Sequence, residues 1–233
     1  MRVIAIAAVA DNGIIGSGQD MLWHLPGDWR RFKQVTMGHR LILGRATYEQ
    51  IGQLPGRRIT VVTRNPQWRP PAGGEVAVGV AEAVRVAADA GEGVCYVGGG
   101  AQIYAEAFRT GVLTDLDITA VHQAPDQGVR FPPIDPTAWT RVKAEPQDGY
   151  DFCFYVPVLR GRHVRLQALP GASWEPTGLG VWQVFQADAD QPPIGHVTWL
   201  DGRVHITGML DAVASAEATH LVQARVRAVG VGG

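Results

Sequence analysis

The sequence is poor in cysteine. Only Cys95 and Cys153 occur among its 233 residues, and both lie in apolar segments. Two cysteines are too few for a disulfide framework, and their spacing is not typical of a zinc site. We therefore expect two reduced thiols in the core of a cytoplasmic protein.

Long apolar runs and an excess of one charge are also missing. No run is long enough to cross a bilayer, and the opening apolar segment 3–10 is closed at once by Asp11-Asn12-Gly13. This pattern indicates a buried first strand rather than a signal peptide. The formal net charge is −1, so no general attraction to anionic surfaces is expected. We expect neither a nucleic-acid partner nor a membrane partner.

Strands and helices alternate over residues 1–160. Short apolar runs predict strands at 3–10, 40–43, 58–63, 93–97 and 116–122. Helices are predicted at 28–36, 44–51, 80–90 and 101–109. Such alternation predicts an α/β fold with a mostly parallel central sheet flanked by helices. A last strand at 152–159 follows without an intervening helix, so we expect an antiparallel C-terminal edge.

The pattern changes after residue 160, and we expect residues 161–233 to form a small, mainly β appendage. Strands are predicted at 163–169, 181–187, 196–200 and 203–207, and the last two flank Asp201-Gly202, a strong hairpin signal. A short helix is predicted at 211–219 and a further strand at 220–229.

Two residue types in the appendage invite a functional interpretation. His196 and His205 would lie on facing hairpin strands, but no Cys or carboxylate joins them, so we expect no metal site. The tryptophans Trp174, Trp182 and Trp199 suit the core of so small a unit, because it must bury every large side chain.

The most informative stretch is Leu22-Trp23-His24-Leu25-Pro26-Gly27-Asp28. Pro26 suits the first position of a helix, which places Asp28 in the first turn. Two interpretations of Asp28 stay open on this evidence. It is either a surface carboxylate, favoured by the helix dipole or paired with Arg31, or a polar group facing an apolar pocket.

Gly16 precedes this stretch, and three further motifs follow it in a fixed order. The whole set comprises Gly16, residues 21–28 with Phe32, Gly44-Arg45-Ala46-Thr47-Tyr48, Leu54-Pro55-Gly56-Arg57 and Gly99-Gly100-Ala101-Gln102-Ile103-Tyr104. In this order and spacing the set resembles a bacterial dihydrofolate reductase over about residues 2–159. The resemblance implies the reductase fold, dihydrofolate as the substrate, NADPH as the cofactor and no metal.

The resemblance implies roles on the substrate side. Asp28, accompanied by Thr119, would bind the 2-amino group and N3 of the pterin ring, because an anionic acceptor forms charge-assisted hydrogen bonds with that edge. Arg57 would hold the α-carboxylate of the glutamate tail in its guanidinium fork. The pterin and benzoyl groups would be lined by Ile6, Ala7, Trp29, Phe32, Ile51, Leu54 and Gly98. Taken singly, the apolar residues suit a plain core nearly as well, and Arg57 could belong to a solvated loop.

On the cofactor side, two strand-to-helix turns would bind phosphate through free backbone N–H groups. The residues implied are Gly44, Arg45, Ala46 and Thr47 in one turn, and Gly99, Gly100, Ala101, Gln102 and Ile103 in the other. The resemblance also implies a cis bond between Gly99 and Gly100. Arg45, Thr63 and Arg64 would surround the adenosine 2′-phosphate, which favours NADPH over NADH. Ala8, Ile15 and Gly16 complete the implied cofactor site.

Residues 16–21 would form a lid over the nicotinamide that excludes water from the hydride transfer. The implied catalytic set is Asp28, Met21, Trp23, Tyr104 and Thr119. Hydride would pass from nicotinamide C4 to pterin C6, and the N5 proton would come from water. Leu22 stands where the family commonly has proline, and segment 128–131 lacks the family's lid-pairing acidic residue, so we expect a looser lid.

Two other functions stay open. A reductase of the same fold that acts on a ribosylated aminopyrimidine in riboflavin synthesis would share the glycine turns, but would not be expected to pair Asp28 with Arg57. A non-catalytic module could retain the fold and use residues 161–233 to dock a partner. The appendage could likewise form a homo-oligomer.

Overall fold

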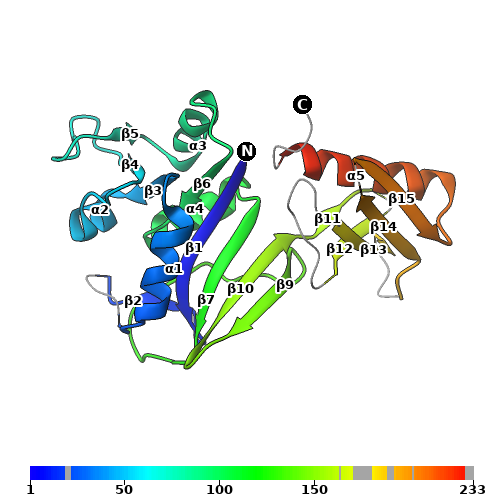
Figure 1. Ribbon diagram of the computed structural model, residues 1–233, viewed down its shortest axis with the longest axis horizontal. Coiled ribbons are helices and arrows are strands. Elements are labelled where there is room, and N and C mark those ends of the chain that lie inside the picture. Colours follow the sequence, from blue (N-terminus) through cyan, green and yellow to red (C-terminus); the bar gives the residue numbers. More distant parts are fainter. Residues whose placement is uncertain (19–21, 163, 170–179, 188–191, 201, 229–233) are drawn as a thin grey trace. The chain divides into compact units, whose positions relative to one another are not determined.

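The structure, a computed structural model, describes residues 1–18, 22–162, 164–169, 180–187, 192–200 and 202–228. The chain divides into two compact units, one of residues 1–133 and 145–153, the other of residues 134–144 and 154–233. Two main β-sheets are present among the described residues, one of eight strands and one of five (Figure 1).

The larger sheet has mostly parallel strands. Strand β1 is parallel to both of its neighbours, and the strands on the β5 side are parallel as well. Only three residues join β9 to β10, so these two neighbours run antiparallel. The expected fold class, with its antiparallel edge, is confirmed. In spatial order the strands are β5 (Glu75–Ala77), β4 (Arg58–Val62), β3 (Arg40–Gly44), β6 (Val94–Val97), β1 (Arg2–Ala10), β7 (Asp115–Val121), β10 (Tyr150–Pro157) and β9 (Trp139–Pro146).

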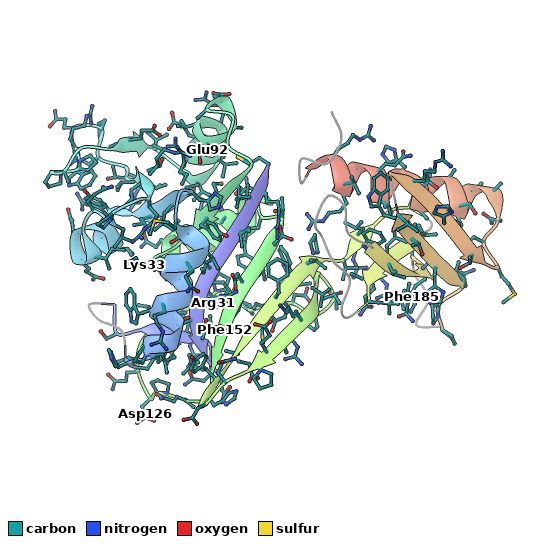
Figure 2. All side chains as sticks on the ribbon, in the orientation of Figure 1. Arg31, Lys33, Glu92, Asp126, Phe152 and Phe185 are labelled. Atoms are coloured by element: carbon teal, nitrogen blue, oxygen red, sulfur yellow. The ribbon has the colours of Figure 1, made fainter. Side chains whose placement is uncertain are left out.

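The four predicted helices of this region are present, and they are α1 (Pro26–Thr36), α2 (Arg45–Ile51), α3 (Val80–Asp89) and α4 (Ala101–Thr110). Helix α1 crosses the sheet, and the side chains of Arg31 and Lys33 extend from it (Figure 2). A small extra sheet pairs β2 (Ile14–Gly16) with β8 (Val129–Arg130). Strands β2, β5, β8 and β9 were not anticipated, because the first three are very short and β9 is largely exposed.

The core beneath α1 and α2 brings together apolar side chains of several strands. Ile4, Ile6, Leu41 and Leu43 are buried there, and Phe32 packs against them from α1. Both cysteines are buried thiols, as expected, and burial raises the pKa of the Cys95 thiol to about 12. Cys95 is therefore a protonated core residue at neutral pH. No helix in the described part of the chain is both long and apolar enough to cross a membrane.

The second sheet is antiparallel, with the strand order β11 (Leu159–Arg160), β12 (Val164–Ala168), β13 (Gly180–Gln186), β14 (Gly195–Leu200) and β15 (Arg203–Gly208). Leu200 pairs with Arg203, which confirms the predicted two-residue hairpin connection. The first four predicted strands of the appendage are thus present, although residue 163 lies outside the described residues.

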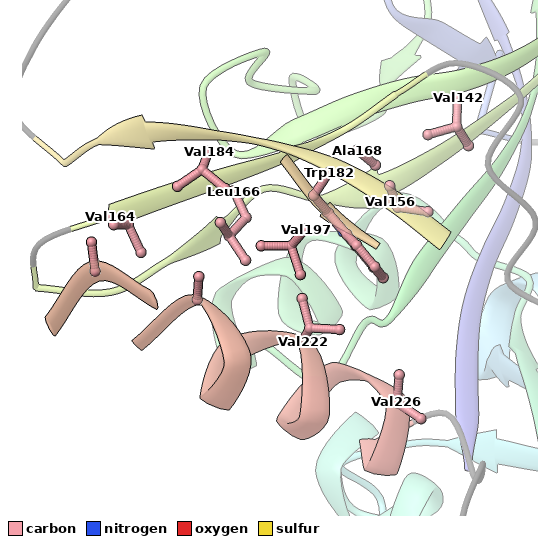
Figure 3. Close-up of a cluster of buried hydrophobic side chains, with 12 residues drawn as sticks. Val142, Val156, Val164, Leu166, Ala168, Trp182, Val184, Val197, Val222 and Val226 are labelled. Atoms are coloured by element: carbon pink, nitrogen blue, oxygen red, sulfur yellow. The ribbon is translucent and has the colours of Figure 1, made fainter. Parts of the chain in front are cut away.

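The predicted strand at 220–229 is wrong. A single helix, α5 (Ala212–Ala228), occupies this segment, and residue 229 lies outside the described residues. Its buried apolar side chains are Ala214, Ala218, Val222 and Val226, spaced four residues apart. This spacing forms one apolar stripe, which lies toward the sheet (Figure 3). The alternation of apolar and polar residues after His220 misled the prediction, because it also fits one helical face.

The second core is built around Trp182, which is fully buried, while Trp199 packs at its margin. Trp174 lies outside the described residues. Val142 from β9 and Val156 from β10 belong to this same core (Figure 3). The expected division after residue 160 remains a prediction, but the packing shows that residues before it contribute to the second unit's core.

Candidate active site

The centre of the candidate site is a hydrogen bond between α1 and β7. Pro26 begins α1, which places Asp28 in the first turn, half-buried. The hydroxyl of Thr119 donates to Asp28 Oδ1 at 2.5 Å. Burial raises the pKa of Asp28, and the Thr119 hydrogen bond and the charge of Arg31 act against that rise. Asp28 is therefore a partly desolvated carboxylate with one oxygen already oriented.

The apolar residues predicted for the substrate side fall into two groups. Ile6 is buried in the core beneath α1 and α2, where Phe32, Ile51 and Leu54 pack against it. Trp29, in contrast, is 43% exposed and meets the ring of Phe32 edge-on. Ala7 and Gly98 are half-buried. The structure thus brings together four of these residues from four different segments.

Arg57 lies in the loop after Leu54. Its Nε and Nη1 atoms are shielded from solvent and have no hydrogen-bond partner among the described residues. Partial burial lowers the pKa of its guanidinium, which nevertheless remains charged at any physiological pH. Shielded N–H groups without a partner are costly, and a carboxylate at a guanidinium edge formed by Nη2 with either of these atoms would accept two parallel hydrogen bonds.

The two glycine turns lie against each other. The amide of Gly44 donates to the carbonyl of Gly99 at 2.6 Å, and the Gly99–Gly100 bond is cis, as the resemblance implies. A Cβ on Gly44 would stand 2.8 Å from Ile103, and one on Gly100 would stand 3.0 Å from the Thr47 hydroxyl. Glycine therefore avoids a clash with Ile103 at position 44 and spares the Thr47 hydroxyl a shift at position 100. It lets the ends of β3 and β6 approach closely where α2 and α4 begin.

Backbone N–H groups at these helix starts have no partner within the helix. Helix α4 begins at Ala101, next to exposed Gln102, and α2 begins at Arg45, next to exposed Ala46. Parallel pairing of Gly44 with Val62 brings the residues that follow each strand to the same edge. Arg45 and Arg64 are exposed there, whereas Thr63 is buried and accepts a bond from the Asn65 amide at 3.2 Å.

Tyr104 links this region to Asp28. Its hydroxyl donates to the carbonyl of Ile6 at 2.6 Å. Burial raises the pKa of Tyr104 far above its usual value, and the charge of Asp28 raises it further, so the phenol stays neutral. A hydrogen-bonded neutral phenol holds α4 to β1 in this position.

The predicted lid is described up to Gly18, and Met21 lies outside the described residues. Ile14 pairs with Arg130 and Gly16 with Val129, so backbone pairing holds the base of this segment. Ile15 and Ala8 are half-buried beside it. Leu22, just beyond the lid, is 40% exposed.

Two further polar groups stand near the lid. The Gln50 side chain donates to the Gly18 carbonyl at 3.0 Å, a contact between α2 and the lid that the sequence did not suggest. Trp23 is buried, and its Nε1 has no hydrogen-bond partner among the described residues. Within the described residues no cluster of three or more His, Cys, Asp or Glu could hold a metal ion.

Comparison with known proteins decides the family. The family model described as dihydrofolate reductase matches residues 2–157. The chain belongs to the dihydrofolate reductase family. "Dihydrofolate reductase HdrB" from Haloferax volcanii is 38% identical over 66% of this chain and 83% of its own length. "Dihydrofolate reductase type 3" from Salmonella typhimurium is 37% identical over 70% of this chain and all of its own length.

A solved member of the family supports the same assignment. Dihydrofolate reductase from Enterococcus faecalis, complexed with NADP(H) and RAB-propyl, is 32% identical with a TM-score of 0.60. The likeness covers 67% of this chain and 96% of that structure. These three matches leave about a third of this chain uncovered, in agreement with an extension beyond the family's minimal fold.

Proposed function

We propose that this family member reduces dihydrofolate to tetrahydrofolate with NADPH at the residues gathered around Asp28. The observation that carries the proposal is the hydrogen bond between Asp28 and Thr119 beside an apolar cluster. Arg57, with its shielded and unpartnered guanidinium atoms, lies on the segment that supplies part of this cluster. A flat heterocycle with an amino edge and a carboxylate tail matches this arrangement.

On the substrate side, Asp28 accepts hydrogen bonds from the 2-amino group and N3 of the pterin. Thr119 already occupies one lone pair of Oδ1, so it orients the carboxylate toward the ring. The negative charge raises the proton affinity of the ring system, which favours protonation at N5 by water. Ile6, Phe32, Ile51 and Leu54 cover the ring and the benzoyl group, and Arg57 binds the α-carboxylate.

On the cofactor side, the residues present fit NADPH. The close glycine contact between Gly44 and Gly99 leaves backbone N–H groups accessible at two helix starts, which suits phosphate. Arg45, Thr63 and Arg64 follow adjacent strands and suit a 2′-phosphate dianion. When bound, NADPH supplies the hydride that pterin C6 accepts. Tyr104 holds the neighbouring backbone, and residues 16–18 with Trp23 exclude water from the reacting atoms.

The activity is tested directly. Purified protein is expected to oxidise NADPH only when dihydrofolate is present, and a 2,4-diaminopyrimidine antifolate is expected to block this, because its protonated ring would pair with Asp28. Absorbance at the NADPH maximum follows the reaction. Turnover with a ribosylated aminopyrimidine but none with dihydrofolate would assign the protein to the riboflavin-pathway reaction instead.

For residues 161–233 we propose a role without a catalytic group, as a contact surface for a second copy or a protein partner. His196 and His205 lie on neighbouring strands, but they are paired with Thr207 and Thr198 rather than with each other. Truncation after residue 160 would be the simplest test of this role. However, the second core also uses Val142 and Val156, so truncation would expose their apolar surface and the resulting loss of stability would obscure any effect on catalysis.

Point substitutions avoid this problem. The double variant His196→Gln, His205→Gln is expected to keep both kcat and KM at the parent values, because neither imidazole would reach a reacting atom. Steady-state kinetics measures this, and light scattering of the same samples reports the oligomeric state. A large loss of kcat at unchanged mass would show that the extension does take part in catalysis.

A further inference from the structure

Arg31 makes a second connection between α1 and β7, close to Asp28. Its Nη2 donates to Asp117 Oδ2 at 2.8 Å, and its Nη1 lies 2.8 Å from Asp117 Oδ1 in an ion contact. The guanidinium also lies 4.5 Å from the ring centre of Phe152 on β10, and Figure 2 labels both side chains. Asp117 is only 5% exposed. The arginine is therefore held on two sides, in a pair largely shielded from water.

The two connections are parallel. Asp28 and Arg31 are three residues apart on α1, so they lie on one side of the helix. Asp117 and Thr119 are two residues apart on β7, so they lie on one face of the strand. A helix carboxylate meets a strand hydroxyl at one point, and a helix cation meets a strand carboxylate at the other. Two such points restrict both the rotation and the sliding of α1 relative to β7.

The Arg31–Asp117 pair also determines the charge next to Asp28. The titratable groups around Asp28 come from three elements: Arg31 from α1 itself, Asp117 from β7 and Tyr104 from α4. Burial is the main cause that raises the pKa of Asp28; the charge of Arg31 lowers it and that of Asp117 raises it. Burial raises the pKa of Asp117 itself. The hydrogen bond and charge of Arg31 and the charge of Arg2 on β1 lower this pKa, and the charge of Glu145 on β9 raises it.

We propose that Arg31 and Asp117 are positioning residues for the reduction of dihydrofolate, which together hold the first turn of α1 in place and balance the charge beside the Asp28 carboxylate. The inference rests on the function proposed above, and it concerns two residues to which the family motifs assign no role. Arg31 supplies the cation that keeps a half-buried carboxylate ionised. Asp117 prevents that cation from being left unpaired in a half-buried position.

The test reads the titration of Asp28 in the protein without ligands, by carbon-13 NMR of labelled aspartate carboxyl groups, with Asp28→Asn to assign the signal. Arg31→Met removes the cation and is expected to move the Asp28 midpoint up by on the order of one pH unit. Asp117→Asn leaves the cation unopposed and is expected to move the midpoint down by a similar amount. Because a loosened site would admit water and lower the midpoint, the upward shift in Arg31→Met is the decisive result.

A matched control lies on the same strand. Asp115 is fully buried on the same face of β7 and accepts hydrogen bonds from Arg2 at 3.1 Å and Thr114 at 2.7 Å. Asp115→Asn is expected to lower the melting temperature and leave the Asp28 midpoint unchanged. Shifts of equal direction in Arg31→Met and Asp117→Asn, or shifts no larger than that of Asp115→Asn, would overturn the proposal.

Two further variants cover the remaining possibilities. If Arg31→Met does not fold, the double variant with Asp117→Asn leaves no unpaired charge, and its midpoint is expected above that of Asp117→Asn alone. Arg31→Lys keeps the charge but loses the planar fork. It is expected to retain the Asp28 midpoint and lose kcat with little change in KM; an unchanged kcat would contradict the positioning role. A parent protein without turnover would refute the proposed function, while the titration would still test the charge balance.

Discussion

Replacing Asp28 with asparagine is expected to lower turnover with dihydrofolate by roughly 10²- to 10⁴-fold at neutral pH. The amide keeps the shape of the carboxylate and can still accept the Thr119 hydrogen bond. It lacks the negative charge that pairs with the amino edge of the pterin and raises the proton affinity of the ring. NADPH affinity is expected to stay at the parent value, because the cofactor residues belong to other elements. Stopped-flow kinetics and cofactor titration measure the two quantities separately.

The same variant has an expected effect on stability. Burial raises the pKa of Asp28 in the folded protein, so the folded state holds this proton more tightly than the unfolded state. The stabilisation from that proton is present below the unfolded pKa and is lost as pH rises through the folded pKa. Asp28→Asn is therefore expected to melt at a higher temperature than the parent at neutral pH, with a difference that shrinks on acidification.

The exposed Asp126 provides the control for both measurements. Asp126→Asn is expected to change neither turnover nor the melting temperature. Near-parent turnover in Asp28→Asn would show that Asp28 acts only as an acidic residue in the first turn of α1. A lower melting temperature than the parent at neutral pH would contradict the assigned direction of its pKa shift.

Arg45 and Arg64 are expected to distinguish NADPH from NADH. Each charged contact with the 2′-phosphate should contribute on the order of 1.5–3 kcal/mol, so Arg45→Ala or Arg64→Ala should bind NADPH roughly ten- to a hundred-fold more weakly. NADH lacks that phosphate, and its affinity is expected to change little. Fluorescence titration with both cofactors gives the ratio of the two dissociation constants.

Arg85 offers a matched exposed arginine on α3, paired with Asp89 at 3.0 Å. Arg85→Ala is expected to leave both affinities unchanged. Equal losses for NADPH and NADH in the Arg45 and Arg64 variants would mean that these guanidinium groups do not read the 2′-phosphate. Rising salt should weaken the NADPH preference of the parent, because both arginines are exposed and their charges are screened.

The local patterns of the sequence predicted most of the larger sheet. Apolar runs such as 40–43 became buried strands because a strand buried on both faces has no polar side. Pro26 and the glycine turns predicted where α1, α2 and α4 begin, since those residues act through their own backbone geometry. The same reasoning failed at 220–229, where an apolar spacing compatible with two periods became one face of α5.

The sequence by itself determined most of the longer elements, the position of Asp28 in a first helical turn, and the family motifs. The partners of Asp28 and Arg31 were decided only by the tertiary structure. Thr119 lies 91 residues after Asp28 and Asp117 lies 86 residues after Arg31. Their meeting depends on the pairing of β7 with β1, which aligns Thr119 with Ala8, and on the rotation of α1 over that face. Such contacts arise because packing brings distant segments together, and no local periodicity encodes which residues then face each other.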